Sequence, residues 1–458
     1  MTYDEAVTYL GALINFEQHH RPQEMRTIRL ERMRRLCQGL GDPQRRFRSV
    51  LVAGTNGKGS ICAMIYSMLR ESGLRVGLYT SPHLEHVRER IRLWPALGAA
   101  AATRAGERSH GDDWIAPEQF AASLERVRAR AEDQPTYFEA VTAAAFWAFA
   151  QQEIDVAVLE VGLGGRLDAT NIVDQGVSVI APIGIDHADV LGTDLVAIAR
   201  EKAGIIKPRQ TVVSAPQADE VLDVLRVVAD AHSVPLMLVG SDVSVTTQHY
   251  DLDGLQITID SARGRYESLR LSLIGRHQAH NAAAAVAAVE ALSETGVPYR
   301  LVEQGLARVE WPGRLEVVND SPLVLMDGAH NPAAAQTLAH SLRELLPGRR
   351  IHLLMGLSSD KTIEEVGQAL GPLAVGVTCT KSHHPRALDP TTLAHRLAPF
   401  CADVHVMSDP ADAYTYLLNA VDPDEVIVVT GSLFLVGELR AALRQAHVRV
   451  RRPAPAAS

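Results

Sequence analysis

Short runs of valine, isoleucine and leucine alternate along the chain with segments of helical periodicity. This alternation is the signature of strands in a parallel sheet that helices cover. In the first half the apolar runs predict strands at residues 49–54, 75–80, 155–162, 177–184, 211–215 and 235–239. Helices are predicted at residues 60–71, 137–152, 195–206 and 219–231. This half is therefore expected to be a doubly wound α/β domain with a mostly parallel sheet.

The second half repeats the pattern on a smaller scale. Residues 243–259 and 266–274 alternate apolar and polar side chains and predict an antiparallel extension, and an alanine-rich helix at 281–294 closes the first domain. Strands predicted at 323–326, 351–355, 375–380, 404–407 and 426–430 indicate a smaller, Rossmann-like C-terminal α/β domain. With a linker at 308–314, we expect domains at 1–310 and 311–458. Residues 96–113 are interpreted as a flexible insertion and 451–458 as a frayed tail.

Composition excludes several classes of protein. The 458 residues are too many for one ordinary core. A net charge of −9 argues against nucleic-acid binding, and no run of 18 apolar residues exists to span a membrane. The N-terminus does not resemble a signal peptide, and the four cysteines form no C-x-x-C pair, so we expect a cytoplasmic protein with reduced thiols and neither a zinc site nor disulfides.

A glycine-rich segment, Gly54-x-x-Gly57-Lys58-Gly59-Ser60, lies between a predicted strand and a predicted helix. It departs from the common phosphate-binding form G-x-x-x-x-G-K-[ST], because Val52 occupies the place of the first glycine. The chemistry is nevertheless that of a phosphate cradle. Glycines let backbone N–H groups approach phosphate oxygens, the helix N-terminus adds partial positive charge, and Lys58 adds a full one.

Polar side chains that suit Mg²⁺ follow three predicted strands. Glu160 ends one apolar strand and precedes a glycine-rich turn, Ser81 follows another, and His187 follows a third. Open α/β sheets bind ligands at the carboxyl ends of their strands, and oxygen ligands are those that Mg²⁺ prefers. Taken alone, His187 could equally be a capping residue, and Lys202 would be interpreted as an ordinary solvated helix residue.

Eight motifs, in order, carry a resemblance to a known family. They are AGTNGKGS (53–60), TSPHL (80–84), TYFE (136–139), LEVGLGGRLDATN (159–171), DHADVLG (186–192), REKAGIIKP (200–208), PGRLE (312–316) and DGAHNP (327–332). The chain resembles the folylpolyglutamate synthase and dihydrofolate synthase family of the Mur ligase superfamily over nearly its whole length. The insertion at 96–113 is longer than this family leads us to expect.

The resemblance implies a Mur ligase central domain and an ATP-dependent ligase that forms ADP and phosphate. A substrate carboxylate would be phosphorylated, and the amine of L-glutamate would attack the acyl phosphate. The acceptor would be dihydropteroate, a folate or both. The enzyme is expected to be a monomer whose partners are these small molecules.

The resemblance also implies residue roles. ATP would contact Gly57, Lys58, Gly59, Ser60, Asn281, Arg314 and Asp327. Mg²⁺, expected as two ions, would be held by Ser81, Glu160, His187 and Lys202, the last as a carbamate. The pterin would contact Thr136, Tyr137, Phe138, Glu139, Leu167, Asp168 and Ala169, and glutamate would contact His330 and Ser432. The residues expected to act in the reaction itself are Lys58, Glu160, His187, Lys202 and His330.

Two alternatives remain open at this point. A Mur ligase acting on a cell-wall nucleotide precursor would share the ATP site, but it normally carries an extra N-terminal domain, for which the residues before the glycine-rich segment are too few. A non-catalytic nucleotide switch would not need Arg314 and Asp327 from a second domain. The sequence leaves open which acceptor is used, the length of any polyglutamate chain and the role of the insertion.

Overall fold

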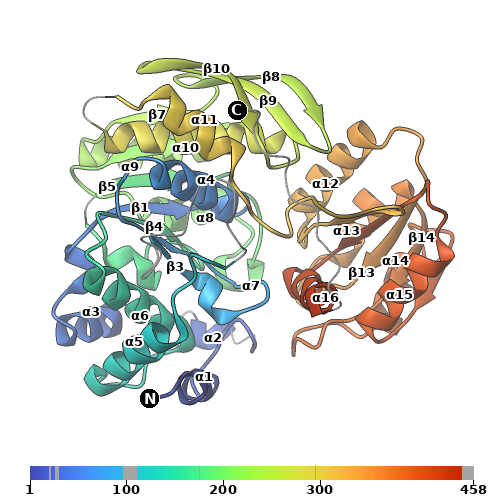
Figure 1. Ribbon diagram of the computed structural model, residues 1–458, viewed down its shortest axis with the longest axis horizontal. Coiled ribbons are helices and arrows are strands. Elements are labelled where there is room, and N and C mark those ends of the chain that lie inside the picture. The colour runs from blue at the N-terminus through green and yellow to red at the C-terminus, as the bar shows by residue number, and fades with distance from the viewer. Residues whose placement is uncertain (20–21, 26–29, 96–110, 175, 294–295, 446–458) are drawn as a thin grey trace.

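In the computed structural model the chain forms two α/β domains that lie side by side (Figure 1). The structure describes residues 1–19, 22–25, 30–95, 111–174, 176–293 and 296–445. The predicted tail at 451–458 and residues 96–110 of the predicted insertion lie outside the described residues. In the described part, no helix is both long and apolar enough to cross a bilayer.

The N-terminal domain is built on a sheet whose seven described strands have the order β3-β2-β4-β1-β5-β6-β7. All neighbours run parallel except β2 and β3. The strands are β1 (Arg48–Ala53), β2 (Val76–Tyr79), β3 (Ile91–Trp94), β4 (Val156–Glu160), β5 (Gly176–Ile180), β6 (Thr211–Ser214) and β7 (Leu236–Leu238). The predicted parallel sheet is confirmed. The edge strand β3 was not predicted, because four residues are too short to show a clear period.

The register of this sheet brings the ends of four strands together. Val52, near the end of β1, pairs with Glu160 on one side and with Val179 on the other. Tyr79 at the end of β2 pairs with Leu159. The segments that follow β1, β2, β4 and β5 therefore all emerge at one edge of the sheet, where such folds bind ligands.

Helices cover both faces of this sheet (Figure 1). One face packs against α4 (Lys58–Arg70), α10 (His277–Leu292) and α11 (Tyr299–Ala307). The other packs against α1 (Tyr3–Gly11), α3 (Leu30–Gly39), α5 (Pro117–Arg130), α6 (Tyr137–Gln151), α8 (Leu195–Ala203) and α9 (Asp219–His232). The short helices α2 (Pro22–Met25) and α7 (Ala188–Leu191) precede α3 and α8. Helix α6 begins at a capping box that the sequence encodes, with Thr136 as N-cap and Glu139 three residues later.

The predicted antiparallel extension is confirmed, with one correction. It consists of β8 (Ser244–Asp251), β9 (Gly254–Ser261) and β10 (Gly264–Leu271). The segment expected to be one strand at 243–259 is two strands joined by a tight turn. Gly254 at that turn has φ +122°, which favours glycine, and a Cβ there would lie 2.1 Å from the Leu271 carbonyl oxygen.

The C-terminal domain is a second open sheet, with the order β11-β12-β16-β13-β14-β15 among the described residues. Only β11, which was not predicted, runs antiparallel to its neighbour. The strands are β11 (Glu316–Asp320), β12 (Leu323–Met326), β13 (Ile351–Met355), β14 (Ala374–Cys379), β15 (Val404–Val406) and β16 (Val426–Thr430). The helices are α12 (Pro332–Leu345), α13 (Ile363–Leu370), α14 (Pro390–Leu397), α15 (Pro410–Ala420) and α16 (Leu433–Gln445).

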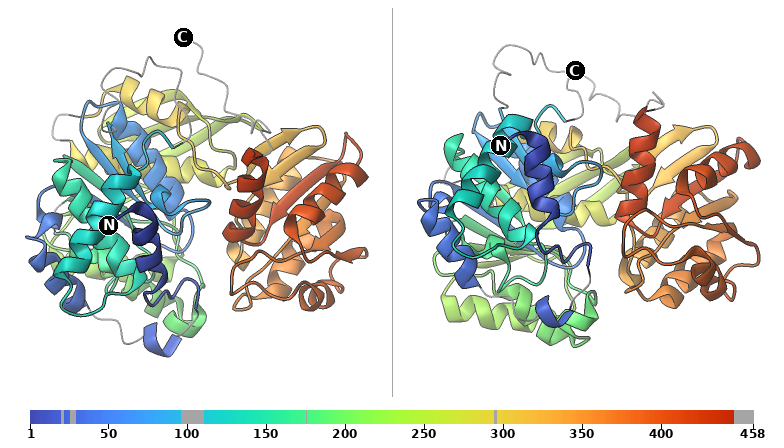
Figure 2. Two further views of the ribbon diagram at one scale, coloured as in Figure 1. Left: turned by 60° about the horizontal axis from the view of Figure 1, so that its bottom comes forward. Right: turned by 90° about the horizontal axis from the view of Figure 1, so that it is seen from below.

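Helix α16 faces the N-terminal domain (Figure 2). Its Arg440, only 3% exposed, forms ion pairs with Glu85 of the N-terminal domain and with Glu316. A Cβ on Gly437 would lie 1.9 Å from the Leu84 carbonyl oxygen, so the two backbones meet directly. Asp113, the last residue of the predicted flexible insertion, is instead buried and pairs with Arg70 at 3.1 Å. The next residue, Trp114, forms a bridge to Arg92 of β3.

Packing on α4 provides a test of the fold. A Cβ on Gly305 of α11 would lie 2.5 Å from the Cα of Met68 in α4. We expect Gly305→Ala to lower the free energy of unfolding by about 1–3 kcal/mol, because the helices would have to separate. Thermal unfolding followed by circular dichroism measures this. Gly11→Ala in α1 is the matched control, since a Cβ there meets no atom of the described residues within 4 Å. An equal loss in both variants would contradict the packing argument.

Candidate active site

The glycine-rich segment joins β1 to α4 at the ligand-binding edge of the sheet. Gly57 is the N-cap of α4 and has φ +84°, a backbone angle that favours glycine. Because Gly57 has no side chain, it leaves the first backbone N–H groups of α4 uncovered. Gly59 lies against Trp311 of the interdomain segment, 2.9 Å from where its Cβ would stand. Lys58 Nζ donates a weak hydrogen bond to the Thr55 carbonyl at 3.2 Å. This is the geometry of an anion site at a helix N-terminus.

All the residues predicted to contact ATP or metal line one cavity of about 400 Å³, which we call the phosphate cavity. From the N-terminal domain these are Gly57, Lys58, Gly59, Ser60, Ser81, Glu160, His187, Lys202 and Asn281. From the C-terminal side they are Arg314 and Asp327. The cavity therefore lies between the domains, and the structure brings together residues that are far apart in the sequence.

Glu160 and Ser81 are directly connected. The backbone N–H of Ser81 donates to Glu160 Oε2 at 3.1 Å. Burial raises the pKa of Glu160, while Lys58 and this hydrogen bond act to lower it. A buried carboxylate next to a lysine and a helix N-terminus is suited to bind a cation that accompanies phosphate.

Lys202 is buried, His187 is partly exposed, and both favour their neutral forms. Burial lowers the pKa of His187 to about 3 and that of Lys202 to about 7. A neutral imidazole can act as a metal ligand, and a neutral amine is the form that reacts with carbon dioxide. Lys202 Nζ donates to the Gly54 carbonyl at 2.8 Å, which places the amine against the glycine-rich segment. The expectation of a solvated lysine without the family resemblance is thus wrong, because Lys202 is 5% exposed.

The side chains in the phosphate cavity can bind Mg²⁺ only if a bound substrate supplies further ligands. In the described part of the chain, no three His, Cys, Asp or Glu side chains gather as a metal site. Glu160, His187 and the Ser81 hydroxyl nonetheless line the same cavity. Mg²⁺ commonly binds one or two carboxylates and completes its shell with phosphate oxygens and water. The residues present therefore fit a Mg²⁺ that binds together with a nucleotide.

Arg314 and Asp327 are held by the start of the C-terminal domain. The Asp327 carboxylate accepts hydrogen bonds from the backbone N–H groups of Leu315 and Ala329, both at 2.8 Å. Burial raises the pKa of Asp327, and Arg314 counteracts this. Asp327 is thus oriented by backbone contacts, and both Arg314 and Asp327 line the phosphate cavity.

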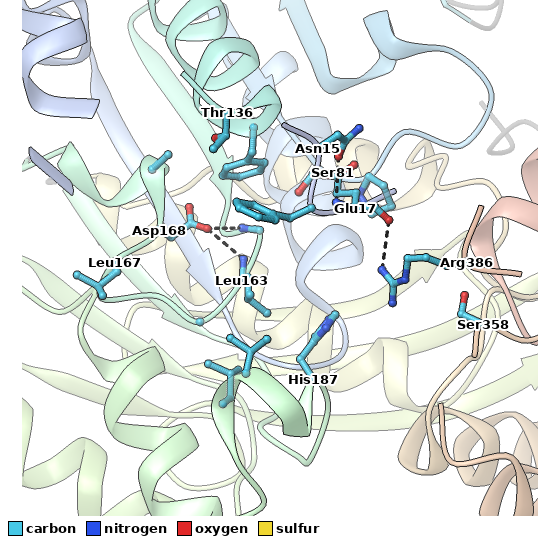
Figure 3. A pocket seen from close by; sticks show the side chains of 18 of the residues that line it. Asn15, Glu17, Ser81, Thr136, Leu163, Leu167, Asp168, His187, Ser358 and Arg386 are labelled. Carbon is cyan, nitrogen blue, oxygen red and sulfur yellow. Dashed lines mark hydrogen bonds between the residues drawn. The ribbon is translucent and has the colours of Figure 1, made fainter. Parts of the chain in front are cut away.

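A second cavity of about 530 Å³ lies next to the first, and we call it the interdomain cavity (Figure 3). The two cavities share Ser81, His187 and His330 in their walls. Of the residues predicted to bind pterin or glutamate, those lining it are Thr136, Phe138, Glu139, Leu167, Asp168, Ala169, His330 and Ser432. Tyr137 does not line it; its ring lies instead behind the wall, below the Arg90 guanidinium.

Asp168 organises the glycine-rich turn after β4. Its Oδ2 accepts hydrogen bonds from the N–H groups of Gly162 and Leu163, both at 3.0 Å (Figure 3). Its Oδ1 accepts from the N–H of Thr170 at 2.9 Å. Burial raises its pKa, which these hydrogen bonds counteract. Gly162 leaves room for Phe138, whose ring would lie 2.6 Å from a Cβ there. The result is a wall that combines an aromatic face with polar groups.

Asp186, which the sequence analysis did not select, connects the two domains. Its carboxylate accepts hydrogen bonds from Lys361 Nζ at 2.6 Å and from Asn331 Nδ2 at 3.0 Å, and His330 Nε2 lies 3.5 Å away. Although burial acts to raise it, the pKa of Asp186 is held well below its usual range by the His330 hydrogen bond and the nearby positive charges. Asn331 also bonds to Asn56 of the glycine-rich segment at 3.0 Å.

Other residues on the interdomain cavity were also missed. They are Asn15 and Glu17 from the N-terminal segment, and Ser358, Lys361, Arg386 and Phe434 from the C-terminal domain. For Ser358, Lys361 and Arg386 a signal existed, because they follow the predicted strands β13 and β14 at their carboxyl ends. No pattern marked the N-terminal segment.

Comparison with known proteins agrees with this geometry. Residues 52–289 match the Mur ligase middle domain, and residues 313–433 match the Mur ligase glutamate ligase domain. The chain is 34% identical to the dihydrofolate synthase/folylpolyglutamate synthase of Bacillus subtilis, over 91% of this chain and 95% of that protein. It is 35% identical to the protein of the same name from Mycobacterium tuberculosis, over 90% and 89% of the two chains.

Solved structures show the same arrangement of domains. The folylpolyglutamate synthase of Mycobacterium tuberculosis complexed with ADP superposes with a TM-score of 0.85 at 33% identity, covering 96% of this chain and 98% of that one. The bifunctional folylpolyglutamate synthase/dihydrofolate synthase of Yersinia pestis complexed with AMPPNP and Mn ion gives 0.82 at 30% identity, covering 97% and 98%.

The two-domain fold and the phosphate cavity define the class: this is a Mur ligase, an ATP-dependent enzyme that joins a carboxylate to an amine. Within that class, the chain belongs to the dihydrofolate synthase/folylpolyglutamate synthase family. The predicted family and the predicted enzyme class are confirmed, and a non-catalytic nucleotide switch is excluded.

The ion pair between Asp186 and Lys361 gives a prediction about domain contact. Both side chains are buried, at 11% and 8% exposure. We expect Asp186→Asn to lower the free energy of unfolding by about 3 kcal/mol, because it leaves the Lys361 ammonium without its nearest anion. Thermal unfolding of Asp186→Asn, Lys361→Met and the double variant measures this. The double variant should lose less than the sum of the single variants; strict additivity would show that the pair contributes nothing.

Proposed function

We propose that this enzyme joins the amine of L-glutamate to the carboxylate of dihydropteroate and to that of folates, at the expense of ATP. The observation that carries the proposal is the common wall of the two cavities. Ser81, His187 and His330 face both the phosphate cavity and the interdomain cavity. An acceptor bound in one can therefore present its carboxylate to a nucleotide bound in the other.

The proposed reaction has two steps. A carboxylate oxygen of the acceptor attacks the γ-phosphorus of ATP, and the bond to ADP breaks, which gives an acyl phosphate. The glutamate amine then attacks the acyl carbon, loses a proton, and phosphate leaves as the amide forms. Phosphorylation is needed because a carboxylate oxygen is a poor leaving group.

In this proposal the phosphate cavity binds ATP. The N–H groups at the start of α4 and the Lys58 ammonium stabilise the negative charge on the transferring phosphoryl group. Gly57, Gly59 and Ser60 let the phosphates approach the backbone, while Asn281, Arg314 and Asp327 contact the rest of the nucleotide. Because Arg314 and Asp327 follow the first domain, ATP would be bound by both domains.

Mg²⁺, as two ions, is proposed to be held by Ser81, Glu160, His187 and Lys202. When bound, it would neutralise phosphate charge. Lys202 can serve only if its positive charge is removed, and reaction of its neutral amine with carbon dioxide gives a carbamate whose oxygens are suitable ligands. The lowered pKa of Lys202, about 7, supports this step.

The interdomain cavity is proposed to hold the other two substrates. The aromatic and polar wall formed by Phe138 and Asp168 suits a flat pterin ring with hydrogen-bonding edges. Thr136, Tyr137, Glu139, Leu167 and Ala169 would complete this wall, Tyr137 from behind. His330 and Ser432, on the opposite domain, would receive glutamate.

We also propose that the domains divide at 310/311, between α11 and β11, and that the enzyme is a cytoplasmic monomer. All four cysteines are buried and free, as is usual for a reducing compartment.

The proposed function is tested by ADP release in a coupled assay with the purified protein. We expect ADP only when ATP, Mg²⁺, L-glutamate and a pterin acceptor are all present, with both dihydropteroate and tetrahydrofolate active. Turnover with only one acceptor would remove the bifunctional part of the proposal. ADP release that depends on neither acceptor would contradict the proposed function as a whole.

The role of Lys202 is tested by chemical rescue. We expect Lys202→Ala to lower kcat by about 100-fold or more, because a metal ligand is lost. Acetate or formate in the buffer should restore part of the activity by occupying the place of the carbamate. Lys202→Arg is the matched control: it retains a cation but cannot form a carbamate, so it should be inactive and not rescued. Normal turnover of Lys202→Ala would show that this lysine has no role at the metal.

A further inference from the structure

Arg386 is a buried cation on the C-terminal wall of the interdomain cavity (Figure 3). Its side chain is 13% exposed. One terminal nitrogen donates to the Glu17 backbone carbonyl at 3.2 Å, and the other donates to Asp360 Oδ2 at 2.5 Å. Its Nε–H has no hydrogen-bond partner among the described residues. A buried donor without a partner is costly, and a guanidinium is suited to bind a carboxylate through two N–H groups.

The loop that carries Arg386 is held in place by backbone contacts. The Ser359 N–H donates to the Arg386 carbonyl at 3.0 Å, and the Leu388 N–H donates to the Leu357 carbonyl at 2.8 Å. These bonds join the segment after β14 to the segment after β13, which carries Lys361. The two cations therefore project from one preorganised part of the C-terminal domain.

Lys361 and Arg386 lie at different distances from the wall that the interdomain cavity shares with the phosphate cavity. Lys361 contacts Asp186, the residue before His187, and so lies next to the wall shared with the phosphate cavity. Arg386 contacts Glu17 and lines only the interdomain cavity. An amino acid whose amine reaches toward His187 would extend its side chain away from the phosphates, toward Arg386.

We propose that Arg386 binds the side-chain carboxylate of the incoming amino acid and so makes the enzyme select glutamate. The inference rests on the proposed function and adds a specificity residue to it. Glutamine, whose amide carries no negative charge, would leave Arg386 with only its ion pair to Asp360 and its hydrogen bond to the Glu17 carbonyl, and would be rejected for this reason. Rejection by an unsatisfied buried polar group gives strong discrimination between substrates of similar shape.

The experiment compares L-glutamate with L-glutamine as amine donor, at saturating ATP, Mg²⁺ and pterin acceptor. For Arg386→Met we expect the KM for glutamate to rise by roughly 10- to 100-fold, as expected for a lost charged hydrogen bond. The ratio of kcat/KM for glutamate to that for glutamine should fall toward one. Arg386→Lys, which keeps the charge, should recover part of the ratio. Arg396→Met is the matched control, because Arg396 pairs with Glu364 outside both cavities and should leave the ratio unchanged.

The selectivity ratio separates recognition of glutamate from a purely structural contact between domains. If Arg386→Met lowers activity with both donors equally, Arg386 only joins the domains through Glu17 and the proposal is overturned. If instead the KM for the acceptor rises while the ratio is unchanged, Arg386 binds the acceptor and the proposal is also overturned. Failure of the wild-type enzyme to use glutamate with any pterin acceptor would reject the proposed function itself, which is a different result.

Discussion

The structure depends on the register of the three central strands of the larger sheet. Because Val52 of β1 pairs with both Glu160 of β4 and Val179 of β5, the three strands end at one level. The glycine-rich segment, the Glu160 carboxylate and the segment leading to Asp186 are consequently neighbours. A slip of one residue would turn the side chain of Glu160 to the opposite face of the sheet. Backbone hydrogen bonds between the strands thus position these three parts of the site relative to one another.

Burial then sets the charge of each group in the site. His187 and Lys202 favour their neutral forms, whereas Asp186 keeps its negative charge because three donors from the other domain and the adjacent backbone surround it. The same low-dielectric environment that removes charge from isolated groups makes the Asp186 pair with Lys361 strong. The charge of the groups in the site therefore depends on contact between the domains. Substrates that enter between the domains, as proposed, would meet groups from both.

Much of the fold could be predicted from the sequence, for identifiable reasons. The central strands are continuous apolar runs, and the Thr136–Glu139 capping box marks the start of α6. The glycine-rich segment was found from its motif, and all the residues expected to contact ATP or Mg²⁺ line one cavity. The strands β3 and β11 were missed because both are short antiparallel edges, and the turn at Gly254 was missed because alternation continues on both sides of it. Asp186, Lys361 and Arg386 were missed because single charged residues in loops carry no periodic signal, and their position after the carboxyl ends of predicted strands was not used.

By itself, the sequence determined the two α/β domains, the glycine-rich anion site and the family, because these depend on local periodicity and on contiguous motifs. Only the tertiary structure decided which distant residues share a wall. Residues 14–17 and the loops at 358–361 and 386 meet across the interdomain cavity through long-range contacts such as that of Arg386 with the Glu17 carbonyl. The burial that shifts the pKa values of His187 and Lys202 likewise arises from packing between distant segments, which no local pattern encodes.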